Sequence, residues 1–385
     1  MVLTFLKRLM VPLLVVGLLL TGCEESQGPT EYGGSNPDPN PTGATPATIS
    51  AVNPPEGFLR QVITIQGSGF QTTPEFNLVR FGTRLGKVIS ATATQLEVEA
   101  PNLADDTVMV QVAIKGSELW SNEESFRFLP TLSVVDDNVP WAKGVAVDAN
   151  DNIYVGSAND GVIYKYTPAG DRSVFVTTTV DGAMEFGPNE WLYVCDQGAG
   201  EVKRISPDGA TIETVTAQPD FSPVDVDWHS SGDMYFVGNG QGIFRLTAGG
   251  QFDQLSSIDN SKAMRIFENT LYVTDIWNNQ ILKYDITPGG LENETQFISW
   301  DPPPAGIEVD KDGVVYFSPA WDTHLVAVYP DGSTEILYEG ELMTPMRYLT
   351  FYKKSIYIVF PGWGDIGTVM SAYIGVDQAP NHGRN

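Results

Sequence analysis

The sequence predicts an all-β protein in which an immunoglobulin-like β-sandwich is followed by a six-bladed β-propeller. Two observations lead to this fold class. Residues 47–129 alternate short apolar strand patterns with turn clusters, which is typical of a small two-sheet sandwich. Residues 131–377 repeat a unit of about 40 residues six times, and four-stranded units of that period build a propeller.

Length and charge limit the classes of protein that fit. The chain has 385 residues, enough for two domains, and it combines 42% hydrophobic residues with 38 glycines and 26 prolines. That composition favours turn-rich β structure. The formal net charge is -26, and an anionic surface repels phosphate backbones. We therefore expect no nucleic-acid partner.

The first 23 residues read as a processing signal. Lys7 and Arg8 precede an apolar run over residues 9–20, which is too short to span a bilayer comfortably. The run ends in "LTGC", which resembles the lipobox of bacterial lipoproteins. The resemblance implies that residues 1–22 are a lipoprotein signal peptide and that Cys23 carries the lipid. An ordinary secretory signal that contains a cysteine is the alternative.

Residues 23–46 predict a tether between the lipid and the first domain. They are rich in Pro, Gly, Asn, Ser and Thr and show no apolar periodicity. Glu24 and Glu25, directly after the lipidated cysteine, resemble the surface-export signals of some Gram-negative lipoproteins. We therefore expect the chain to be anchored to the outer membrane through Cys23 and to face outward.

The sandwich segment carries a family resemblance. In "QVITIQGSGF" the residues alternate between two faces, and Gly67 and Gly69 then end the strand. Together with "NPPEG", "NLVRFG", "ATQLEVEAP" and a final "FRF", this segment resembles an IPT/TIG domain. Such a domain implies a spacer or a binding module, and residues 47–129 contain no catalytic constellation.

The propeller units share a tyrosine in an apolar strand, as in "NIYVG" and "TLYVT". "LYVTDIWNNQILKYD" and "LYVCDQGAGEVKRISPDG" resemble NHL repeats, which implies an NHL-type propeller. The last unit lacks its fourth strand, and "LSVV" at residues 132–135 can supply it and so close the ring. Residues 378–385 read as a polar tail. The repeat tyrosines are Tyr154, Tyr193, Tyr235, Tyr272, Tyr316 and Tyr357.

Five tryptophans map to one face of the propeller. Trp277, Trp321 and Trp363 occupy the loop between the second and third strands of blades four, five and six. Trp141 and Trp300 lie in connections between blades, which emerge on the same face. Exposed rings beside Asp and Asn suit sugars, because the ring stacks on C–H groups and the polar groups bond hydroxyls. The alternative is that each indole packs over its own blade.

Charged residues recur on the innermost strands, around the propeller axis. Three acids and two arginines there can compensate one another as a paired channel lining. They can also form a polar floor for a ligand, in which the arginines grip a carboxylate or sulfate in a bidentate manner. The aligned positions are Glu185, Asp225, Arg265, Glu308 and Arg347, with Ala146 in the first blade.

Enzyme chemistry finds little support in the residues. The chain has three histidines and no zinc-binding cluster, so we expect no catalytic residue, no metal and no cofactor. His324 is the best single candidate for proton transfer. Six-bladed propellers that resemble gluconolactonases hold a divalent cation on the axis, and Arg265 and Arg347 argue against such a site here.

These observations predict a membrane-anchored, outward-facing lipoprotein that binds a ligand without transforming it. The tryptophan face makes a glycan the leading ligand. The layout resembles accessory lipoproteins of polysaccharide uptake, which implies an outer-membrane uptake complex as a partner. A protein–protein interaction scaffold is a second hypothesis, and a lactonase- or lyase-like propeller enzyme is a third.

Overall fold

In the computed structural model of the protein, the described residues form two compact units. Within them, no helix is long and apolar enough to cross a membrane. The predicted signal peptide, Cys23 and most of the tether lie outside the described residues, and so does Trp363. The structure describes residues 38, 40–101, 107–218, 220–362 and 365–381.

The N-terminal domain is an all-β sandwich with eight strands among its described residues. They hydrogen-bond in the order β1-β3-β6-β5-β4-β7-β8-β2. The elements are β1 (Thr48–Asn53), β2 (Glu56–Gly57), β3 (Val62–Ser68), the short 3-10 helix η1 (Pro74–Phe76), β4 (Asn77–Phe81), β5 (Arg84–Ala91), β6 (Gln95–Glu99), β7 (Thr107–Ile114) and β8 (Glu124–Phe128).

Alternating side chains build the core of this sandwich. In β4, Val79 and Phe81 are fully buried while Leu78 and Arg80 are partly exposed, as the period of two in a strand requires. The first half of β5 pairs with β4 and its second half pairs with β6, so β5 joins the two layers. Gly67 allows a close approach, since a Cβ there would lie 2.0 Å from the Thr48 carbonyl oxygen.

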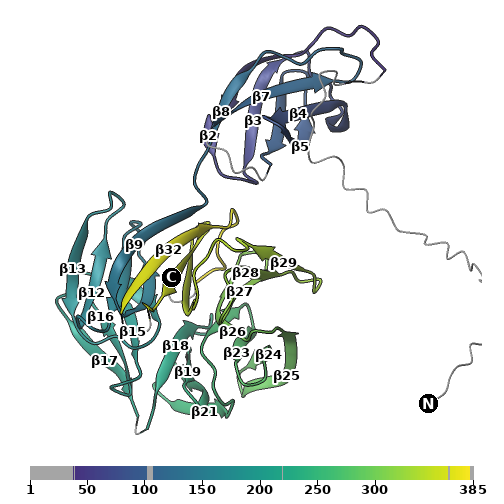
Figure 1. The fold of residues 1–385 in the computed structure, drawn as a ribbon. Coiled ribbons are helices and arrows are strands. Elements are labelled where there is room, and N and C mark those ends of the chain that lie inside the picture. Colours follow the sequence, from purple (N-terminus) through teal and green to yellow (C-terminus); the bar gives the residue numbers. More distant parts are fainter. Residues whose placement is uncertain (1–37, 39, 102–106, 219, 363–364, 382–385) are drawn as a thin grey trace, which may run out of the picture. The chain divides into compact units, whose positions relative to one another are not determined.

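The C-terminal domain is a propeller of six four-stranded antiparallel sheets among the described residues (Figure 1). The innermost strands of successive blades contact one another, and that of blade six contacts that of blade one, so the ring is closed. A 3-10 helix, η2 (Pro188–Glu190), lies in blade two. From inside to outside, blade one has strands β10 (Ala142–Val147), β11 (Ile153–Ser157), β12 (Val162–Tyr166) and β13 (Arg172–Thr177), and blade two has β14 (Met184–Phe186), β15 (Leu192–Asp196), β16 (Glu201–Ile205) and β17 (Ile212–Ala217). Blade three has β18 (Pro223–Trp228), β19 (Met234–Gly238), β20 (Gly242–Leu246) and β21 (Phe252–Ser256), and blade four has β22 (Met264–Phe267), β23 (Thr270–Asp275), β24 (Gln280–Thr287) and β25 (Gly290–Ser299). Blade five has β26 (Pro304–Val309), β27 (Val315–Pro319), β28 (Leu325–Val328) and β29 (Thr334–Leu337), and blade six has β30 (Tyr348–Tyr352), β31 (Ser355–Phe360), β32 (Ile366–Tyr373) and β9 (Leu132–Pro140).

The predicted closure of blade six is confirmed. β9 lies antiparallel beside β32, and the two strands run side by side in Figure 1. The pairing starts at Leu132 opposite Ala372 and continues past Val139 opposite Gly367. The closing strand is longer than the predicted residues 132–135, because it runs on to Pro140. The two ends of the domain therefore share one blade, and no open edge remains there.

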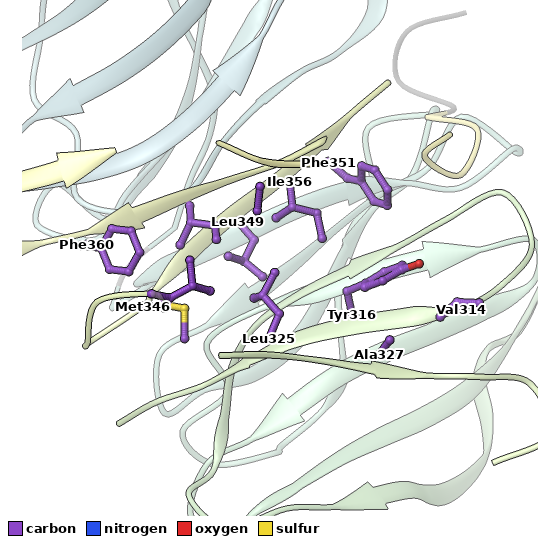
Figure 2. Packing of buried hydrophobic residues seen from close by; sticks show 12 residues of the cluster. Val314, Tyr316, Leu325, Ala327, Met346, Leu349, Phe351, Ile356 and Phe360 are labelled. Carbon is purple, nitrogen blue, oxygen red and sulfur yellow. The ribbon is translucent and has the colours of Figure 1, made fainter. Parts of the chain in front are cut away.

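The core of the propeller lies between neighbouring blades. Figure 2 shows one such cluster, in which side chains from β27, β28 and adjoining segments of blade five meet side chains from β30–β32 of blade six. Loss of one large side chain from a core of this kind typically costs about 2–5 kcal/mol. The labelled residues are Val314, Tyr316, Leu325, Ala327, Met346, Leu349, Phe351, Ile356 and Phe360.

The repeated tyrosine has a structural role in two blades. Tyr154 donates a hydrogen bond of 3.0 Å to Asp148, and Tyr316 donates one of 2.9 Å to Asp310. Each aspartate also accepts backbone N–H groups of its own turn, including that of Val314. The tyrosine thereby ties the second strand to the turn that follows the first, which explains why the strand and the turn recur together.

The C-terminal segment packs on the propeller. Residues 378–385 read as a polar tail in the sequence, and residues 378–381 of it are described. The Ala379 N–H donates to the Val309 carbonyl over 3.0 Å, and Gln378 pairs with Asp310 in an isolated bridge. The Asn381 side chain donates to Glu185 over 2.9 Å. The segment thus runs from the turns after the first strands to the axis.

Candidate functional site

One face of the propeller carries the candidate site, and we call it the loop face. It bears the loops between the second and third strands of each blade together with the connections between blades. Strand direction alternates within each blade, so all these segments emerge on the same side. Loops of this kind carry function on a rigid scaffold.

The loop-face tryptophans differ in exposure. Trp277 is 71% exposed and Trp321 is 56% exposed, so both rings project from the domain. Trp141 is 38% exposed. Trp300 turns inward and packs edge-on against Phe317, with ring centroids 5.6 Å apart. The rings of Trp277 and Trp321 therefore face solvent. Trp300 instead packs against the domain, as the alternative expectation had it.

Trp277 borders a cleft of about 680 Å³. The cleft is lined by residues of blade four and of the segment that joins blade three to blade four. Ile258 and Leu282 supply apolar surface beside the indole. Carboxylates, amides and hydroxyls line the rest, a mixture typical of small-molecule sites. The polar lining residues are Ser256, Ser257, Asp259, Asp275, Asn278, Gln280 and Glu294.

Asp275 fixes the loop that presents Trp277. Its carboxylate is buried and accepts the Asn278 side-chain amide over 2.7 Å and that of Gln280 over 3.0 Å. Asn279 adopts a left-handed conformation with a φ of 53°, which asparagine tolerates better than most residues. The indole is thus exposed on a loop that is already ordered, so little entropy is lost when a ligand stacks on it.

On the axis, Arg265 is held by internal partners. Its guanidinium donates to Asp225 over 2.8 Å and to Glu308 over 2.7 Å. It also donates to two backbone carbonyls, those of Met264 and Leu349. These four hydrogen bonds engage the guanidinium, and the side chain is buried. Arg265 therefore belongs to a compensated lining and cannot grip a ligand carboxylate.

Three buried carboxyl groups, those of Asp225, Asp227 and Glu308, surround this one guanidinium. Burial raises the pKa of Asp227 to about 7 and that of Glu308 to about 8, while the positive charge of Arg265 opposes the shift. Asp225 is also shifted upward by burial. Among the described residues Asp227 has no direct ion pair, and it accepts backbone N–H groups from Ile266 and Trp228. With a pKa of about 7, Asp227 changes its protonation state near neutral pH.

The pH dependence of stability tests this assignment. A carboxyl with a raised folded pKa stabilises the fold fully below its unfolded pKa, and this contribution is lost as pH rises through the folded value. For Asp227 the window runs from the ordinary aspartate pKa of 3.8 to about 7, and the loss is on the order of 4 kcal/mol. Chemical denaturation at several pH values measures the free energy of unfolding. Between about pH 4 and pH 7 we expect this free energy to fall less steeply in Asp227→Asn than in wild type. Equal slopes would contradict the assignment.

The strand register corrects the alignment of the axial residues. Glu185 pairs with repeat Tyr193 and Glu308 with Tyr316, but the partner of Tyr235 is Asp227 rather than Asp225. In blade six the partner of Tyr357 is Thr350, and Arg347 precedes β30 near the loop face. The alignment was wrong in these two blades because it matched the charged residue instead of counting back from the tyrosine. The ring at one level is Ala146, Glu185, Asp227, Arg265, Glu308 and Thr350.

The axial residues do not fit a divalent cation. Arg265 lies between the carboxylates of Asp225 and Glu308, which a hard cation would need as ligands. In the part of the chain that the structure describes, no group of three or more His, Cys, Asp or Glu side chains is arranged to hold a metal. His324 is buried, and its Nε2 lies 3.9 Å from the Asp322 carboxylate, beyond hydrogen-bond distance.

The fold defines a class: an IPT/TIG domain followed by a six-bladed β-propeller. Residues 47–128 match the IPT/TIG domain family, which confirms the resemblance of the first domain. No curated protein sequence matches the chain significantly.

Solved structures of similar fold include two from Bacteroides thetaiotaomicron that match beyond the propeller. An auxiliary nutrient binding protein is 13% identical, with a TM-score of 0.53, over 86% of this chain and 99% of its own. A protein of unknown function is 15% identical, with a TM-score of 0.55, over the same shares. A gluconolactonase from Xanthomonas campestris is 18% identical, with a TM-score of 0.56, over 63% of this chain and 89% of its own. At these identities the likeness concerns the fold alone.

Proposed function

We propose that the protein is a lipid-anchored, outward-facing binding protein whose propeller captures a glycan on the loop face. The observation that carries the proposal is the exposed Trp277 indole at the border of a polar cleft. An indole exposed over 71% of its surface presents a large apolar face, and a ligand that covers this face is stabilised by its burial.

The chemistry of the cleft matches a sugar ring. Trp277 offers a flat apolar face for C–H groups, and Asn278, Gln280 and Asp259 offer acceptors and donors at its edge. The Tyr284 hydroxyl donates to Glu294 over 2.7 Å, which orients a carboxylate of the cleft. Trp321, in the corresponding loop of blade five, is 56% exposed and offers a second ring to a longer glycan.

The anchoring part of the proposal rests on the sequence. The "LTGC" motif that ends at Cys23 and the polar tether after it suit a lipoprotein held at the outer membrane. The auxiliary nutrient binding protein shares the fold over 86% of this chain. Its name supports capture of a nutrient as the role, in an accessory to polysaccharide uptake.

Affinity electrophoresis of the purified full chain tests the glycan proposal. We expect retention in gels that contain a matching polysaccharide. We expect Trp277→Ala to reduce the apparent affinity about ten-fold or more, because burial of a large apolar side chain contributes on the order of 1.5–3 kcal/mol. Trp321→Ala is expected to reduce the affinity less, unless the glycan is long enough to span two blades.

Trp191→Ala serves as the matched control. Trp191 lies in the turn before β15, on the opposite face, and stacks beneath Arg204 at 4.6 Å. Its loss removes an indole of the same domain without touching the cleft. Retention that falls equally in the Trp191 and Trp277 variants, or mobility unchanged across a broad polysaccharide panel, would overturn the proposal. A partner protein captured with full strength in excess soluble sugar would point to a scaffold instead.

A further inference from the structure

We infer that the loop-face end of the propeller axis is an anion subsite, built from Arg347, Lys262 and Lys143, that takes a carboxylate or sulfate group of the ligand. The inference rests on the proposed function and narrows the ligand to an acidic glycan. We call this cluster the axial mouth. Its residues come from three different blades and precede or begin an innermost strand.

Arg347 is the least engaged cation of the axial mouth. Its backbone N–H donates to the Val359 carbonyl over 3.1 Å, which fixes its position before β30. Its guanidinium lies 5.9 Å from the centroid of the Tyr348 ring. Among the described residues the guanidinium has no ion-pair or hydrogen-bond partner, in contrast to Arg265. Its paired N–H donors are thus available for a bidentate oxyanion.

The two lysines are held at the same end of the axis by short contacts. Lys143 is buried, and its ammonium lies 2.6 Å from Asp181 and 4.4 Å from the centre of the Trp141 ring. Lys262 is half-buried and donates to the Asn239 side chain over 2.5 Å. Of the nearby carboxylates, Asp181 pairs with Lys143 and Asp225 pairs with Arg265. Asp259 acts on Lys262, so Arg347 is the cation without an ion-pair partner among the described residues.

Tyr348 is the second and independent observation. Its side chain is 4% exposed, and its hydroxyl has no hydrogen-bond partner among the described residues. The ring packs between blades six and one, and the hydroxyl lies in the field of Arg347 and Asp181. Burial raises the pKa of Tyr348 to about 12, so the group remains a donor at neutral pH. A buried donor without a partner is costly, and a bound oxyanion would satisfy it.

One chain segment links the axial mouth to the Trp277 cleft. The connection between β21 and β22 lines the cleft through Ser257, Ile258 and Asp259. The same connection then places Lys262 at the axial mouth. A glycan that stacks on Trp277 can therefore extend along this connection and present an acidic group to Arg347.

Calorimetric titration of the full chain with glucuronate, inorganic sulfate and glucose tests the subsite. We expect glucuronate or sulfate to bind and glucose not to bind, and the stronger of the two identifies the source of the anion. Arg347→Gln and Lys262→Gln are each expected to weaken anion binding about ten-fold or more, because each removes a charge-assisted hydrogen bond. Arg204→Gln, which removes an exposed arginine paired with Glu213, is the control and should change nothing.

The pH dependence of anion affinity is a second test, because it depends on the charge of Lys262 and not on a structural role of that residue. Burial and the positive charge of Arg347 lower the pKa of Lys262 to about 8, and the nearby carboxylate of Asp259 opposes this shift. Lys262 is charged below that value and neutral above it. Anion affinity should therefore fall as pH rises through about 8 in wild type and stay flatter in Lys262→Gln.

The two proposals fail in different ways. If neither anion binds better than glucose, or if Arg347→Gln and Lys262→Gln both bind as wild type does, the subsite is overturned while the Trp277 cleft keeps its own test. If anions bind as expected but Trp277→Ala keeps full retention of every polysaccharide, the subsite stands and the glycan proposal fails. Thermal unfolding curves that superimpose with wild type confirm that each variant is folded.

Discussion

Val139→Asp is expected to unfold the propeller or to lower its free energy of unfolding by about 3–5 kcal/mol or more. Val139 is fully buried in the closing strand β9, opposite Gly367 of β32. A carboxylate there cannot reach water without detaching the strand that joins the first and last blades. Detachment would open the ring and expose the edge of β32.

Val134→Asp is the matched control for this prediction. Val134 lies in the same strand and pairs with Met370, but it is 57% exposed, so the same substitution keeps its charge in water. We expect it to change the free energy of unfolding by less than about 1 kcal/mol. Denaturant titrations of the two variants measure the difference. Similar stabilities would show that β9 does not close the ring.

Arg265→Met is expected to cost about 3–5 kcal/mol of stability at neutral pH. The change removes the partner of Asp225 and Glu308 and leaves both carboxylates buried without a compensating charge. Methionine fills most of the volume, so the loss reports the charge more than a cavity. Denaturation followed by circular dichroism measures it.

The loss should depend on pH with a definite sign. Without the guanidinium the folded pKa values of the buried carboxyls rise further, and the neutral forms are the ones that burial tolerates. The Arg265→Met variant should therefore be closer to wild type at about pH 5 and further from it at about pH 8. Arg204→Met, which breaks an exposed pair with Glu213, should cost about 1 kcal/mol or less at both values. A loss that is independent of pH would argue for packing rather than charge.

The fold could be predicted from the sequence because its signals are periodic. Each repeat tyrosine pairs with the innermost strand of its own blade, so the spacing of the tyrosines counts the blades. Blade six lacks a fourth strand of its own, and the apolar segment at residues 132–135 was the segment expected to supply it. That segment begins β9, which pairs with β32. Both features follow from backbone pairing, which a single sequence displays through its period.

The axial level could have been read from the sequence by a different count. Glu185, Asp227 and Glu308 each stand eight residues before their repeat tyrosine. Asp225 and Arg347 stand ten residues before theirs and lie nearer the loop face. Loop lengths after the first strands vary little, so the tyrosine is a better reference than the nearest charge.

The remaining parts of the site depend on packing between side chains, which leaves no local signal. Trp277 and Trp300 both sit among polar residues in the sequence, yet one projects and the other packs on Phe317. Asp259, between β21 and β22, and Glu294, in β25, line the same cleft although they are far apart in the sequence. The guanidinium of Arg265 is held by hydrogen bonds to two carboxylates, and that of Arg347 has no such partner among the described residues. This difference depends on the three-dimensional surroundings of the two side chains.

Residue-level footprinting tests the central claim most directly. The full chain is oxidised by hydroxyl radicals with and without a polysaccharide that retains it in gels, and modification is measured by mass spectrometry. Because Trp277 is 71% exposed, we expect strong modification in the free protein and clear protection when the glycan is bound. Trp191, on the opposite face, should be modified equally in both states. Bound glycan that leaves Trp277 as reactive as before would contradict a glycan site on the loop face.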